Sequence, residues 1–116
     1  MASNVILFGW NRPIPGREKM SAQHFGDFVQ YLGGLQQKAA IQGFETVFLD
    51  AHGGDFNGFF LIKGESAKLD ALISTSEWLT HMTRAALHLE GSGVVRGATG
   101  NEVMDRMALW TSLLPS

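Results

Sequence analysis

Four side chains of this sequence are suited to acid–base chemistry, and all are histidines: His24, His52, His81 and His88. The ordinary pKa of histidine lies near neutrality, so its ring can accept and return a proton at physiological pH. His24 is followed by Asp27 and Tyr31 at helical spacing, which places all three on one side of a helix. We predict a catalytic group in which His24 transfers the proton and Asp27 or Tyr31 orients its ring. The alternative is a histidine at the edge of the core that bonds a polar neighbour.

A second set of polar side chains forms one stripe at helical spacing: Glu77, His81, Arg84 and His88. Glutamate and histidine both bind metal ions, but the H-E-x-x-H motif of helical zinc sites is absent. The stripe lies opposite Leu79 and Met82 on the helical wheel, so we interpret it as a solvent-exposed face. We therefore expect no metal site. The glycines in residues 91–93 lack the spacing of nucleotide-binding loops, and we expect no other cofactor.

Aromatic and basic side chains supply the candidates for ligand binding. Phe8, Trp10 and Trp78 are large enough to line an apolar pocket for a planar ligand; the alternative is that they belong to the core. Arg12 stands in a proline-rich loop, where a guanidinium can hold a carboxylate through two hydrogen bonds; the alternative is a solvated charge. His52 belongs to a two-glycine turn, which is either an anion-binding nest or a simple hairpin loop.

The elements that must position these side chains follow from the apolar pattern and from the turn residues. Residues 4–10 form an unbroken apolar run of strand length, and two prolines then force a loop. Apolar residues at helical spacing indicate a helix over 17–41, and a glycine-bearing loop at 52–56 indicates a hairpin. In chain order the prediction is a strand at 4–10, a helix at 17–41, strands at 44–51 and 57–63, helices at 65–73 and 74–89, a strand at 94–96, and a last helix opening at Thr99.

Two details of these helices can be predicted from residue type. A glycine costs up to about 1 kcal/mol inside a helix, so the glycine pair at 33–34 predicts either close packing there or an early end of the first helix. Ser74 with Glu77, and Thr99 with Glu102, have the spacing of a capping box. In a capping box two side chains bond the first free backbone N–H groups of a helix. We expect both helices to open in this way.

The order strand–helix–strand–strand–helix–strand is that of the ferredoxin-like split βαβ arrangement. We predict one α+β domain over residues 1–116, with a four-stranded antiparallel sheet, helices on one face and an extra C-terminal helix. Leu7 and Phe8 point to opposite faces of this sheet, as do Phe59 and Phe60. Because both faces are apolar, the second face needs a covering layer. We predict a homodimer whose two sheets face each other; the alternative is a monomer partly covered by its C-terminal helix.

The composition excludes several classes of protein. Charged residues make up 17% of the 116 residues, against roughly 25% in an average domain, which fits an additional buried surface. The net charge of −2 gives no reason to expect a nucleic-acid partner. No apolar run approaches the roughly 20 residues of a membrane span, and the first residues lack the basic region of a signal peptide. Cysteine is absent, which excludes disulfides, and we expect a cytoplasmic protein.

Three segments carry a resemblance to a known superfamily: NVILFGW followed by RPIPGREKM, the hairpin FETVFLDAHGGDFNGFFLIKG, and the late strand in GSGVVRGATG. The chain resembles the dimeric α+β barrel superfamily over nearly its whole length. That superfamily includes antibiotic-biosynthesis-type monooxygenases and muconolactone isomerase-like, EthD-like and YCII-like proteins, and the chain is most similar to small uncharacterised bacterial members. The resemblance implies a dimeric barrel. It implies no particular activity, because the fold supports oxygenases, isomerases, haem proteins and simple binders.

Three functions are compatible with these residues. The first is binding of a small, largely apolar molecule in a cleft between the sheet and the first two helices. The second is a cofactor-free monooxygenase or isomerase acting on an aromatic or enolisable compound, with His24 transferring the proton and Arg12 holding an anionic group. The third is a structural or interaction module with a filled core and no ligand. A pocket with His24 pointing into it would favour the enzyme.

Overall fold

The main sheet consists of four antiparallel strands. The computed structural model describes residues 2–116, and the strands are β1 (Val5–Trp10), β3 (Gly43–Phe48), β4 (Gly58–Lys63) and β6 (Gly93–Gly97). Their order across the sheet is β3-β4-β1-β6, so Leu7 of β1 lies between Leu61 of β4 and Val95 of β6. A separate two-residue ladder joins β2 (Arg12–Pro13) to β5 (Leu89–Glu90).

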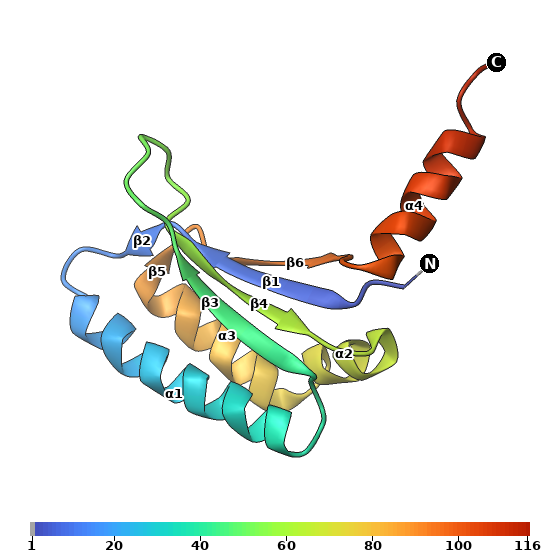
Figure 1. The fold of residues 1–116 in the computed structure, drawn as a ribbon. Coiled ribbons are helices and arrows are strands. Elements are labelled where there is room, and N and C mark those ends of the chain that lie inside the picture. The colour runs from blue at the N-terminus through green and yellow to red at the C-terminus, as the bar shows by residue number, and fades with distance from the viewer. Residues whose placement is uncertain (1) are drawn as a thin grey trace.

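Three helices cover one face of this sheet (Figure 1): α1 (Glu18–Gln37), α2 (Ser66–Ile73) and α3 (Ser76–His88). The paired central strands β1 and β4 come from the two halves of the chain, and each half adds one outer strand. This topology is that of the split βαβ arrangement, so the predicted ferredoxin-like α+β architecture is confirmed. Among residues 2–116, no helix has both the length and the apolar composition needed to cross a bilayer.

The helix ends differ from the predicted ones. The helix α1 ends at Gln37 and runs through the glycine pair at 33–34, and an added Cβ at either glycine would meet no atom within 4 Å. The prediction of close packing or an early end is therefore wrong. Buried Leu32 and Leu35 on the same turns hold this part of α1 against the core, which offsets the poor helix propensity of glycine.

Neither predicted capping box forms. At the start of α3 the side chain of Thr75, not Ser74, accepts a hydrogen bond from the backbone N–H of Trp78 at 3.2 Å. The fourth helix, α4 (Asn101–Ser112), is preceded by Gly100 with a φ of 63° and has no side-chain cap. A carboxylate oxygen of Glu102 instead accepts a hydrogen bond from the backbone N–H of Ala2 at 2.9 Å. A long-range partner has replaced the local one in this case.

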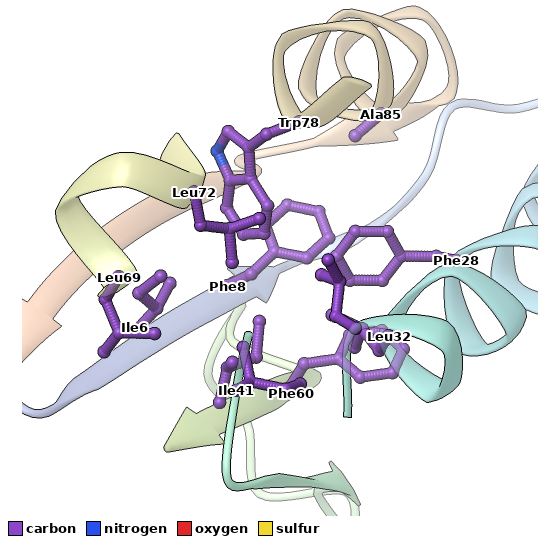
Figure 2. Close-up of a cluster of buried hydrophobic side chains, with 12 residues drawn as sticks. Ile6, Phe8, Phe28, Leu32, Ile41, Phe60, Leu69, Leu72, Trp78 and Ala85 are labelled. Atoms are coloured by element: carbon purple, nitrogen blue, oxygen red, sulfur yellow. The ribbon is translucent and has the colours of Figure 1, made fainter. Parts of the chain in front are cut away.

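The hydrophobic core lies between the sheet and the three covering helices (Figure 2). Alternate residues of β1 and β4 point into it, among them Ile6, Phe8 and Phe60. Phe28 of α1 meets the two phenylalanines of the sheet, with ring centroids 5.5 Å from Phe8 and 5.0 Å from Phe60. Trp78 of α3 is buried in the same cluster. Each such side chain stabilises the fold by roughly 1.5–3 kcal/mol through removal from water.

The opposite face of the sheet is apolar, and no helix within residues 2–116 covers it. Leu7, Phe59 and Leu61 are only half-buried there, and the side chain of Val95 is 61% exposed. The helix α4 leaves the end of β6 and projects away from the sheet (Figure 1), so it does not serve as the covering layer. Within α4 itself no residue is buried, although Val103, Met107 and Trp110 give it an apolar side, and the exposed Leu114 follows just beyond its end.

Candidate functional site

An aromatic cleft lies between α1 and the end of the sheet at which β1 and β3 finish. Its volume is about 300 Å³, which is the lower end of the range for small-molecule sites. Ser21 and His24 from α1 and His88 from the end of α3 contribute to its wall. The remainder of the wall is dominated by aromatic rings: Phe8, Trp10, Phe25, Phe28, Phe48 and Phe60. The cleft thus combines an apolar interior with a small polar patch.

The indole of Trp10 forms one side of this cleft because the residue opposite it in the sheet is a glycine. Trp10 pairs with Gly58 of β4, and a Cβ on Gly58 would lie 2.7 Å from Cζ2 of the indole. Because Gly58 has no Cβ, the indole can lie close to β4. Its ring centroid is 5.6 Å from that of Phe60 and 6.3 Å from that of Phe48. Phe25 approaches Phe60 to 5.5 Å. Rings at these separations suit a planar aromatic guest, which can stack or meet them edge to face.

Three histidines and one serine form a continuous hydrogen-bonded chain beside the cleft, called here the serine–histidine chain. Ser21 Oγ lies 2.6 Å from Nδ1 of His88, and Nε2 of His88 lies 2.8 Å from Nδ1 of His24. Nε2 of His24 then lies 3.0 Å from Nδ1 of His81. All three distances are those of ordinary or short hydrogen bonds. Both nitrogens of His24 and of His88 are therefore used within the chain.

Two neighbouring helices bring this chain together. Ser21 and His24 are one turn apart on α1, and His81 and His88 are two turns apart on α3, so each pair lies on one side of its helix. The two helices run side by side on the sheet (Figure 1). His24 and His88 are each 3% exposed, whereas His81 is half-buried. The chain therefore leads from the wall of the cleft, through two buried rings, to a partly exposed one.

Burial keeps the three imidazoles uncharged at neutral pH. Removal from water lowers the pKa of His24 to about 4, and the nearby charge of Arg84 acts in the same direction. Burial is also the main reason that the pKa values of His81 and His88 are lowered, with Arg84 again second. Arg84 is held in place by Asp27, at 2.8 Å between Nη2 and Oδ2. A neutral imidazole carries one N–H and one free lone pair, so each ring can donate one hydrogen bond and accept one.

The structure brings only some of the predicted site residues together. His24, Phe8 and Trp10 lie in the wall of the cleft. Asp27 does not bond His24; its carboxylate accepts hydrogen bonds from Arg84 and from Gln23. Asp27 therefore affects the histidine through charge only.

The other predicted residues lie outside the wall of the cleft. Tyr31 packs its ring on His81, with centroids 4.4 Å apart, and its hydroxyl is buried without a hydrogen-bond partner among residues 2–116. Arg12 is half-exposed and pairs with Asp55 at 3.1 Å. Trp78 is a core residue, 3% exposed. The turn histidine His52 is exposed and contacts the carbonyl oxygen of Asp50.

The interpretation of the α3 stripe as a solvent-exposed face is wrong for its two histidines. His88 is buried and His81 half-buried, whereas Leu79, placed on the apolar side, is 64% exposed. The sequence did contain a signal for this burial. Trp78, His81, Ala85 and His88 follow one another at spacings of three and four residues, so they share one face of α3 with two apolar residues that are buried. Ser21, Phe25, Phe48 and Phe60 were also not predicted as site residues, because nothing in their local sequence distinguishes cleft from core.

The ring nitrogens of the three histidines point at one another and not at a common point where a metal ion could bind. Among residues 2–116, no group of three or more histidine, aspartate or glutamate side chains is arranged to hold a metal ion. The bonds between successive ring nitrogens explain this, because a ligand nitrogen must direct its lone pair at the metal and not at another ring. The arrangement suits the transfer of protons between neighbouring nitrogens instead.

Comparison with solved structures supports the fold. A dimeric protein of unknown function and ferredoxin-like fold from Bacteroides fragilis NCTC 9343 superimposes with a TM-score of 0.58 and 12% sequence identity, covering 84% of this chain and 97% of that one. The chain has a ferredoxin-like fold. No family model matches the sequence, and no curated protein matches it. The resemblance to the antibiotic-biosynthesis-type, EthD-like and YCII-like groups therefore stays a prediction.

Proposed function

We propose that this protein binds a small, planar aromatic molecule in the aromatic cleft, with the polar group of the ligand directed at Ser21. The observation that carries this proposal is the composition of the wall, in which six aromatic rings outnumber four polar residues: Glu18, Ser21, His24 and His88. Apolar walls with a few polar groups are typical of small-molecule sites, where the polar groups orient the ligand. The purely structural interpretation requires a filled core, and the cleft described above argues against it.

Calorimetric titration with a phenol tests the binding proposal. We expect 4-nitrophenol to bind and cyclohexanol, which has a hydroxyl but no aromatic ring, to bind far more weakly. Phe25→Ala removes a ring from the cleft, and we expect about fivefold weaker binding, since an aromatic contact contributes about 1 kcal/mol. Phe56→Ala is the matched control, because Phe56 is as exposed as Phe25 (38% against 37%) but lies outside the cleft. Equal binding of 4-nitrophenol and cyclohexanol would contradict the proposal. So would an equal loss of affinity for 4-nitrophenol in Phe25→Ala and Phe56→Ala.

A second candidate function is proton transfer on an enolisable substrate, as in a cofactor-free isomerase. The observation that favours it is the neutral state of the imidazoles beside the cleft, because only an uncharged ring can act as a base. A monooxygenase would in addition need molecular oxygen as co-substrate. Exchange of the α-hydrogens of 2-indanone for deuterium from heavy water, followed by NMR, measures this activity. We expect Ser21→Ala to slow the exchange and His52→Gln, in an exposed turn, to leave it unchanged.

We propose further that two copies of the chain associate through the open face of the sheet. Leu7, Phe59 and Leu61 give this face an apolar centre, and the projecting α4 adds a second apolar surface beside it. The similar protein from Bacteroides fragilis is described as dimeric. Light scattering after size-exclusion chromatography tests the proposal. Val95→Glu on the open face should halve the mass, whereas Leu79→Glu, on an equally exposed site of α3, should not.

A further inference from the structure

We propose that Ser21, His88, His24 and His81 form a proton relay, which carries a proton from a ligand in the aromatic cleft to the outer nitrogen of His81. The relay rests on the proposed function, because it needs a ligand with an acidic hydroxyl or enol at Ser21. It extends that function by assigning a path and an exit for the proton. Its starting observation is the unbroken series of contacts of 2.6, 2.8 and 3.0 Å between the four side chains.

Each contact in this series needs one donor and one acceptor, which leaves only two arrangements for three neutral rings. In the first, the Ser21 hydroxyl donates to Nδ1 of His88, and every ring carries its proton on Nε2. In the second, every ring carries its proton on Nδ1, and His88 donates to Ser21 Oγ. The tautomers of the three rings are thus coupled, since changing one ring alone would set two donors or two acceptors against each other.

Passage of one proton converts the first arrangement into the second. The ligand hydroxyl gives its proton to Ser21 Oγ, and the serine passes its own proton to Nδ1 of His88. The Nε2 proton of His88 moves to Nδ1 of His24, and the Nε2 proton of His24 moves to Nδ1 of His81. The Nε2 proton of His81 leaves to water. The ligand is then an anion that accepts a hydrogen bond from Ser21, and all three rings are again neutral.

The positions of the two ends fit a path that crosses the layer of helices. Ser21 lies in the wall of the cleft, as do the two buried rings, whereas His81 is not part of that wall. His81 is half-buried and bonds His24 through Nδ1, so its Nε2 is the free end of the chain. The charged groups that act on these rings are Arg84, which disfavours a cationic ring, and two carboxylates with the opposite effect: Asp27 acts on His24 and His81, and Glu77 acts on His81. Arg84 acts on all three rings, so a proton is not trapped on any of them.

The tautomers can be tested without a ligand, by NMR of protein with ¹⁵N-labelled histidine at neutral pH. Protonated and unprotonated ring nitrogens have widely separated ¹⁵N shifts. The relay requires the rings of His24, His81 and His88 to be neutral and to share one tautomer, or to average between the two together. Opposite tautomers in adjacent rings, or a cationic ring, would overturn it. This measurement tests the coupled tautomers separately from binding, so it can overturn the relay while the binding proposal stands. Failure of the probe to bind would overturn the proposed function and, with it, the source of the relayed proton.

The movement of the proton can be tested with 4-nitrophenol, whose anion absorbs at longer wavelength than the neutral phenol. In the unmodified protein we expect bound probe to be largely anionic and the three ring signals to shift together. His81→Phe keeps an aromatic ring against Tyr31 but removes the exit. Binding and the anionic fraction at equilibrium should then stay within about twofold, because His81 lies outside the cleft, while the rate at which bound probe loses its proton after a jump in pH falls severalfold. His52→Phe is the control and should leave this rate unchanged. An unchanged rate in His81→Phe would overturn the relay and leave the binding proposal intact.

Discussion

His24 and His88 are 64 residues apart in the chain, yet Nδ1 of one lies 2.8 Å from Nε2 of the other, and each ring is only 3% exposed. Burying two imidazoles in contact is unfavourable if either is charged, because the cation loses its hydration and repels its neighbour. The hydrogen bond between them offsets the burial only while both rings are neutral. The stability and the chemistry of the site therefore depend on the same protonation state.

The stability of the protein should fall in mild acid. The pKa of His24 is about 4 in the folded chain against an ordinary 6.5, so between these two values the unfolded chain binds more protons than the folded one. The free energy of unfolding then decreases as the pH falls from about 6.5 to 4, by on the order of 3 kcal/mol from His24 alone. Urea denaturation at fixed protein concentration measures this. His24→Phe should flatten the dependence, and an unchanged slope in that variant would contradict the assignment.

Arg84 should control the charge state of the serine–histidine chain. Its positive charge lowers the pKa of each of the three rings, second only to burial. Replacing it with glutamine should raise the three pKa values, although burial keeps that of His24 below its ordinary value. NMR titration of the ring resonances gives these values directly. Asp27→Asn is the opposite control, because the negative charge of Asp27 raises the pKa of His24, and its removal should lower that pKa. Shifts in the same direction for both variants would rule out this role for Arg84.

Gly58 should be required for the shape of the aromatic cleft. An alanine there would place its Cβ 2.7 Å from the indole of Trp10 and 3.0 Å from the backbone oxygen of Val47. Because the backbone oxygen cannot turn away, we expect Gly58→Ala to destabilise the fold by about 1–3 kcal/mol and to weaken binding of 4-nitrophenol. Gly43→Ala is a suitable control, since a Cβ there meets no atom within 4 Å. Chemical denaturation and calorimetry measure the two effects.

Gly34→Ala should stabilise the protein. Gly34 lies inside α1, and a Cβ would meet no atom within 4 Å, so the gain of helix propensity is not opposed by a clash. We expect an increase of roughly 0.5–1 kcal/mol in the free energy of unfolding. Gly100→Ala should have the opposite sign, because its φ of 63° lies in the left-handed region. Destabilisation by Gly34→Ala would contradict this expectation.

Local sequence determined the elements of this protein and their order. The apolar run of β1, the glycine-bearing loop before β4 and the helical spacing of Phe28, Leu32 and Leu35 depend on neighbours in the chain. Such short-range patterns reflect the geometry of a single strand or helix. The lack of apolar–polar alternation in β1 and β4 also indicated that both faces of the sheet are apolar. The ferredoxin-like topology followed, because few arrangements satisfy this order of elements.

Tertiary structure alone decided which side chains form the site. The sequence placed His81 and His88 on a polar stripe of α3, but the packing of α3 beside α1 buried part of that stripe against His24 and left Leu79 in water. Trp10 and Trp78 are chemically alike, yet the first lies in the wall of the cleft and the second in the core. The physical reason is that the rotation of a helix about its axis is set by the fit of its whole surface to its neighbours, which no local pattern contains.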